Sequence, residues 1–106
     1  MSSRTDEPGR FSLPPGATTY RTIGPFDGDS LPKGLLREHR LKELTWGRLR
    51  VLSDEIRFVW DDGGGTPDSF IARANTIVVI PPTVPHHLEL LGPNVLVEID
   101  FMEVSA

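Results

Sequence analysis

The chain contains no cysteine, which excludes a disulfide framework, a thiolate metal site and a cysteine nucleophile. Apolar runs are short: the longest aliphatic run, residues 77–80, falls far below the roughly 20 residues that cross a bilayer as a helix. Basic residues are the minority, with 11 Lys and Arg against 15 Asp and Glu. This balance disfavours nucleic acids and anionic membranes as partners. The sequence predicts a soluble cytoplasmic protein with neither a nucleic-acid nor a membrane partner.

What the chain has in excess is glycine and proline, which together supply 20 of its 106 residues. A chain of this length forms a single domain. So many turn-forming residues argue against a helical bundle and favour short strands joined by turns.

Apolar and polar residues alternate along much of the chain, which is typical of strands with one buried face. The apolar run at 77–80 differs, because it is continuous and ends at two prolines. Short strands at about ten-residue spacing favour an antiparallel sandwich or barrel. Strands are predicted near residues 48–51, 56–60, 70–73, 77–80, 86–91 and 95–101.

The first third of the chain has a weaker pattern. Residues 1–18 carry little to bury, and we expect a flexible tail there, with the folded domain spanning residues 19–106. Turn residues surround the single apolar anchor Phe26 in the segment 20–32. The segment 33–45 partly fits a helical period but lacks a cap signature, so we expect extended structure.

The three histidines are the side chains whose ordinary pKa lies nearest neutrality. His86 shares a strand face with Leu88, so it is expected to point inward. A buried imidazole either is satisfied by the backbone as a core residue or binds a ligand, and the sequence leaves both open. His87 lies on the opposite face and is expected at the surface, whereas His39 stands between two charged residues.

Several short motifs occur in an order that resembles a known family. Pro81, Thr83 and His86 have the spacing of the second cupin motif, although Thr83 stands where that motif has glycine. Taken together, the motifs make the chain similar to the TehB/YeaR-like domain family of small, tellurite-resistance-related proteins. The other motifs are Gly24-Pro25-Phe26, the segment Pro32 to His39, Trp46-Gly47-Arg48-Leu49 and Ile99-Asp100-Phe101.

The resemblance implies a cupin-like fold, which is an antiparallel β-barrel (a double-stranded β-helix) with a pocket at one mouth. Many cupins hold a divalent metal there, such as Zn, Fe, Ni or Mn. His86 matches the second-motif ligand and His39 falls near the first-motif histidines, while the third ligand is left open between Glu43 and Asp100. Two imidazoles alone are a poor site for a transition metal, which usually takes at least three protein ligands.

Two functions follow from the resemblance. The first is a module that binds a metal ion or a small molecule in the barrel mouth, in the response to tellurite, other oxyanions or stress. The alternative is a metal-dependent cupin enzyme, of the dioxygenase or isomerase type, that works through His39 and His86. Because cupins often pair through sheet edges or outer sheet faces, we also expect a homodimer, with residues 20–26 as the docking arm.

Overall fold

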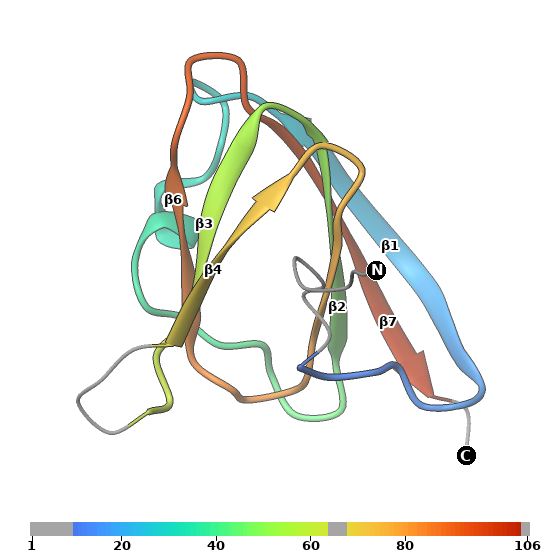
Figure 1. Ribbon diagram of the computed structural model, residues 1–106. Coiled ribbons are helices and arrows are strands. Elements are labelled where there is room, and N and C mark those ends of the chain that lie inside the picture. The colour runs from blue at the N-terminus through green and yellow to red at the C-terminus, as the bar shows by residue number, and fades with distance from the viewer. Residues whose placement is uncertain (1–9, 64–67, 105–106) are drawn as a thin grey trace, which may run out of the picture.

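The computed structural model describes residues 10–63 and 68–104, which form an all-β domain with one turn of 3₁₀ helix (Figure 1). All the strands predicted from the alternating pattern are confirmed, and β1 is an addition to them. The elements are β1 (Ala17–Phe26), η1 (Lys33–Leu36), β2 (Trp46–Ser53), β3 (Glu55–Trp60), β4 (Asp68–Arg73), β5 (Ile77–Ile80), β6 (His86–Leu90) and β7 (Leu96–Val104).

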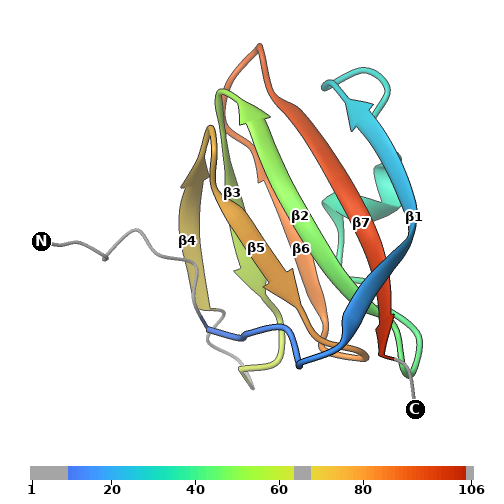
Figure 2. The same ribbon diagram turned by 90° about the vertical axis from the view of Figure 1, so that its right-hand side faces the viewer.

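The described strands form two antiparallel sheets. Sheet A has the order β1-β7-β2-β5 and sheet B has the order β4-β3-β6. The two sheets lie face to face (Figure 2). The closed barrel that we expected is not found among these strands. The edge strands β1 and β5 of sheet A make no ladder with the edge strands β4 and β6 of sheet B, and the fold is therefore a two-sheet sandwich.

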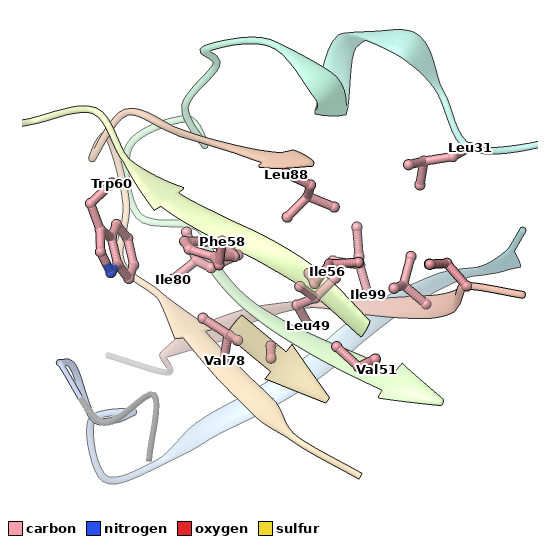
Figure 3. Close-up of a cluster of buried hydrophobic side chains, with 13 residues drawn as sticks. Leu31, Leu49, Val51, Ile56, Phe58, Trp60, Val78, Ile80, Leu88 and Ile99 are labelled. Carbon is pink, nitrogen blue, oxygen red and sulfur yellow. The ribbon is translucent and has the colours of Figure 1, made fainter. Parts of the chain in front are cut away.

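The core lies between the sheets and follows from the period-2 pattern. Alternate residues of β2 and β3 point inward, so that Leu49, Val51, Ile56 and Phe58 are almost wholly buried (Figure 3). Trp60 continues the β3 row and its ring contacts Phe58 edge-on, with 4.7 Å between centroids. Trp60 is almost wholly buried and is therefore a packing residue.

The N-terminal segment is more ordered than a tail where the structure describes it. Residues 1–9 lie outside the described residues, so the predicted tail is seen only from residue 10 onward. Phe11 packs edge-on against Trp60, at 5.2 Å between ring centroids, and β1 begins at Ala17. Residues 17–26 pair with β7 instead of forming the turns that we expected. The homodimer stays a prediction.

The outer face of sheet A carries a network of charged side chains around Asp100. Its carboxylate is nearly inaccessible and accepts hydrogen bonds from Arg48 (2.9 Å), Arg50 (2.7 Å) and Thr22 (2.8 Å). Burial alone would raise the pKa of Asp100, but the hydrogen bonds from Thr22, Arg50 and Arg48 outweigh it and hold the pKa below its ordinary value. These residues stand on three adjacent strands, and the network therefore links β1, β7 and β2.

Asp100→Ala should destabilise the domain by about 2–3 kcal/mol, because it leaves two half-buried guanidinium groups without their shared acceptor. Glu98→Ala is the matched control on the same face, since Glu98 pairs with Arg50 but is far more exposed. That substitution should cost less than about 1 kcal/mol. Urea unfolding of the three proteins measures both values, and equal losses would contradict the central position of Asp100.

Candidate functional site

Two loops meet at the lower end of the sandwich in Figure 1. The first spans residues 37–45, and the second spans residues 81–85 and begins at the prolines that end β5. Backbone hydrogen bonds join the loops: His39 and His86 exchange both N–H···O bonds (3.0 and 2.9 Å), and the Thr83 N–H donates to the Leu41 carbonyl (2.9 Å). The two loops therefore behave as one unit.

A close approach between Leu41 and Gly47 fixes the first loop against sheet A. A Cβ at position 47 would stand 3.0 Å from the Leu41 side chain, which is tighter than ordinary van der Waals contact. The absence of a side chain in the Trp46-Gly47 motif thus lets Leu41 pack onto the start of β2.

The bridge also brings the two imidazole rings together, with 4.2 Å between their centroids in an edge-on contact. In His86, Nδ1 lies 2.8 Å from the Val84 carbonyl, and in His39 it lies 3.0 Å from the Arg37 carbonyl. A carbonyl only accepts, so Nδ1 carries the proton in both rings. When such a ring is neutral, its lone pair is on Nε2, the tautomer that a metal ligand or an acceptor requires.

His86 is embedded in the aromatic part of the core. Its ring stacks on Phe58, with 5.5 Å between centroids and 10° between planes, and Trp60 stands edge-on to it. Burial lowers the pKa of His86 to about 4, against the opposing effect of the Val84 hydrogen bond. The ring is therefore neutral at physiological pH, and its packing matches the core histidine that the sequence offered as one alternative.

Neither candidate third ligand joins this pair. Asp100 lies on the outer face of sheet A in its ion pairs with Arg48 and Arg50, and Glu43 lines a groove that does not include the histidines. Within residues 10–63 and 68–104, no three His, Cys, Asp or Glu side chains are placed to hold a metal ion. The donor set therefore does not fit a cupin-type centre with three or four protein ligands.

The groove lies beside the joined loops, has a volume of about 890 Å³ and is open to solvent. Its apolar lining consists of Tyr20, Leu44, Trp46, Pro82 and Val104. The polar lining consists of Lys42, Glu43, Thr45, Thr83 and Glu103. The volume lies within the range of about 300–1,000 Å³ that small-molecule sites occupy.

Two residues that line the groove have a strained backbone conformation. Leu44 has a φ of 69° and Thr83 has a φ of 67°, a left-handed conformation that is unusual for a branched side chain and most of all for a β-branched one. Leu44 is also 84% exposed, so core packing does not hold it there. Strain of this kind concentrates where a protein binds a ligand or performs chemistry.

His87 occupies the outer face of sheet B, as expected. Its Nδ1 lies 2.7 Å from an Asp61 carboxylate oxygen and its Nε2 lies 3.3 Å from Glu89. Burial alone would lower the pKa of His87, but the hydrogen bonds to Asp61 and Glu89 outweigh it and raise the pKa. This histidine belongs to a surface charge network separate from the two loops.

The groove was not anticipated from the sequence as a unit. Its residues come from β1, β2, β7 and the two loops, and only the pairing of β1 with β7 brings Tyr20 to the same end as Glu103. The sequence feature that could have indicated the groove is the run 42–46, which contains two charged residues, an exposed leucine and a tryptophan.

The fold and groove define a small two-sheet β domain, and a family model described as the TehB-like domain matches residues 21–99. The chain therefore belongs to the TehB-like domain family. TehB from Haemophilus influenzae is similar, with a TM-score of 0.78 and 23% identity over 85% of this chain and 32% of that chain. A protein from Escherichia coli K12 matches with a TM-score of 0.80 and 20% identity over 91% and 99%.

The chain thus spans about a third of the length of the Haemophilus protein. No curated protein matches it. Within the described residues, no helix is long and apolar enough to cross a membrane.

Acidification should weaken the fold through His86. The folded ring stays neutral down to its pKa of about 4, whereas the unfolded ring protonates near its ordinary value of 6.5. The unfolded state therefore binds more protons in this window, and the free energy of unfolding falls as the pH drops through it. From this group we expect a loss of about 2 kcal/mol between about pH 7.5 and about pH 5.

Urea unfolding of the wild type and of His86→Phe at the two pH values measures this effect. The loss of unfolding free energy on acidification should be much smaller in the variant than in the wild type. His87 acts in the opposite sense, because its raised pKa adds stability that is lost as the pH rises. His87→Gln should therefore show a steeper loss on acidification. If the free energy of unfolding of His86→Phe depends on pH as it does in the wild type, the assignment of this pH dependence to His86 is contradicted.

Proposed function

We propose that this domain is a small-molecule-binding module whose ligand occupies the groove beside the joined loops. The observation that carries the proposal is the strained backbone of Leu44 and Thr83 on the two loops that line the groove. Two side-chain-bearing residues in left-handed conformations, one on each of the joined loops, support a surface shaped for a ligand at some expense of stability.

The chemistry of the lining supports the same function. Trp46 and Tyr20 offer aromatic surface, while the Tyr20 hydroxyl lies 3.5 Å from the Thr45 hydroxyl at the groove wall. A mixture of apolar area and a few convergent polar groups is typical of ligand sites. No pair of groups in the lining has the arrangement of a nucleophile and its base, so binding is proposed rather than catalysis.

The family supplies the setting of the proposed function. A role in the response to tellurite, other oxyanions or stress would fit membership of the TehB-like domain family. The groove itself has two carboxylates and one ammonium group, a balance that does not favour an oxyanion as the bound ligand. We therefore propose an organic molecule as the ligand.

Removing the strain should raise stability and lower binding. Leu44→Gly and Thr83→Gly should each increase the free energy of unfolding, by up to about 1 kcal/mol, because glycine adopts a positive φ without a Cβ penalty. Asn75→Gly is the matched control, since Asn75 also has a positive φ (73°) but lies outside the groove lining.

The readout is NMR titration with 2-phenylethylamine, followed at the Trp46 indole N–H, together with urea unfolding. The wild type and Asn75→Gly should bind alike, and the two groove variants should bind at least about threefold more weakly because the more mobile loop must be ordered on binding. Unchanged affinity in both groove variants would contradict a role for the strained loops. No response of the wild type to 2-phenylethylamine, to 2-phenylethanol or to 3-phenylpropanoate would contradict the function.

Metal binding at the histidine pair is the second candidate, and the shared tautomer of His39 and His86 favours it. The two Nε2 atoms would supply two ligands and water the others, which makes a weak, exchangeable site. In calorimetric titration with ZnCl₂, uptake should vanish in His86→Ala, fall strongly in His39→Ala and persist in His87→Ala. Equal uptake by the wild type and His86→Ala would contradict this candidate.

A further inference from the structure

We infer that the groove selects small organic cations, namely molecules that carry one ammonium group on an apolar or aromatic body. This inference rests on the proposed function and adds the class of ligand. It is drawn from how the protein distributes its own charges around the groove.

Elsewhere on the described surface, most acidic side chains have a cationic partner within 4 Å. Arg57, Arg73 and Arg50 lie opposite Glu89, Glu55 and Glu98 on neighbouring strands. Asp61, Asp62 and Asp100 are likewise paired, with His87, Arg10 and the two arginines of sheet A. Pairing is thus the usual state of a carboxylate in this domain.

The two carboxylates of the groove are among the exceptions, as are Asp27, Asp29 and Asp54, which lie outside the groove lining. Among the described residues, neither Glu43 nor Glu103 makes an ion pair or a side-chain hydrogen bond, although Lys42 lines the same groove. The formal charge of the lining is one unit negative. Carboxylates that the fold leaves without partners, gathered around a cavity, offer an electrostatic site to a cation.

A second feature of the lining points to a ligand independently of the carboxylates. The Thr45 side chain stands in the groove wall and is only 5% exposed. Its one side-chain partner among the described residues is the Tyr20 hydroxyl at 3.5 Å, which is the outer limit of a hydrogen bond. A buried hydroxyl held so weakly has capacity for a polar group of a ligand.

The aromatic lining fits the same class of ligand. Trp46 is half-buried and Tyr20 is 47% exposed, so both rings have accessible surface. An ammonium group placed over such a ring gains a cation–π interaction in addition to its attraction to the carboxylates. The apolar side chains Leu44 and Val104 would then cover the body of the molecule.

Three probes with one phenylethyl body and different charges test the inference: 2-phenylethylamine, 2-phenylethanol and 3-phenylpropanoate. NMR shifts at Trp46, Thr45 and Thr83 in the full chain report binding in the groove. The amine should bind about fivefold or more tightly than the alcohol, and the carboxylate more weakly than the alcohol. The preference should shrink at high salt.

Charge-neutralising variants separate the groove from general surface charge. The double variant Glu43→Gln/Glu103→Gln should reduce the affinity for the amine to that for the alcohol, whereas Lys42→Gln should increase it about twofold. Glu38→Gln is the control, because Glu38 is an exposed carboxylate outside the groove lining, and it should have no effect.

The outcomes distinguish the two proposals. Binding of the alcohol or the carboxylate in the groove as tightly as the amine would overturn cation selectivity and leave the proposed function standing. Full affinity for the amine in Glu43→Gln/Glu103→Gln would also overturn cation selectivity and leave the proposed function standing. If no probe shifts the groove resonances, both the inference and the proposed function are overturned.

Discussion

The end of the sandwich that carries the groove depends on the antiparallel bridge in which His39 and His86 each donate an N–H to the other's carbonyl oxygen. The bridge joins two loops that are far apart in sequence, and the Thr83 to Leu41 hydrogen bond extends it by one step toward the groove. The rings reinforce the connection, since His86 packs on Phe58 and His39 contacts the His86 ring edge-on. A groove wall made of two loops would otherwise have the conformational freedom of surface segments.

Charge arrangement adds a second constraint. The outer face of sheet A is neutralised by a network in which Asp100 accepts from Arg48 and Arg50, and the outer face of sheet B has cross-strand pairs such as Arg57 with Glu89. These pairs match the register of the strands, so they contribute to sheet pairing. Glu43 and Glu103 of the groove are not part of these pairs, and in the proposed function they are available to a ligand.

Alternation of apolar and polar residues predicted most of the strands from β2 onward, because one face of each is buried, and β5 was indicated by its continuous apolar run. Alternation failed for β1, whose residues 18–22 are all exposed and which is held by backbone pairing with β7 and not by burial. The inward orientation of His86 followed from its position beside Leu88. Its contact with His39 could be expected only from the family resemblance, since the residues between them carry no signal of the bridge. Predicting the groove from the sequence would have required knowledge of which strands are neighbours in the sheets.

The sheet arrangement was predicted only in part. Family resemblance indicated two antiparallel sheets, and strand spacing left sandwich and barrel open. The difference lies in whether edge strands such as β4 and β5 share hydrogen bonds, and no local pattern determines this. The third metal ligand was uncertain for a similar reason. Because successive side chains of a strand point to opposite faces, the alternation along the last strand placed Asp100 on the outer face, whereas the family resemblance made it a candidate ligand.

The most direct test of this account is amide hydrogen exchange at His39, Thr83 and His86, resolved by NMR in the intact chain. We predict that all three N–H groups exchange as slowly as those in the centre of β2 and β3, since each donates to a carbonyl across the two joined loops. Exchange at the rate of exposed loop amides would show that the loops open independently, and it would contradict the central claim that they form one unit.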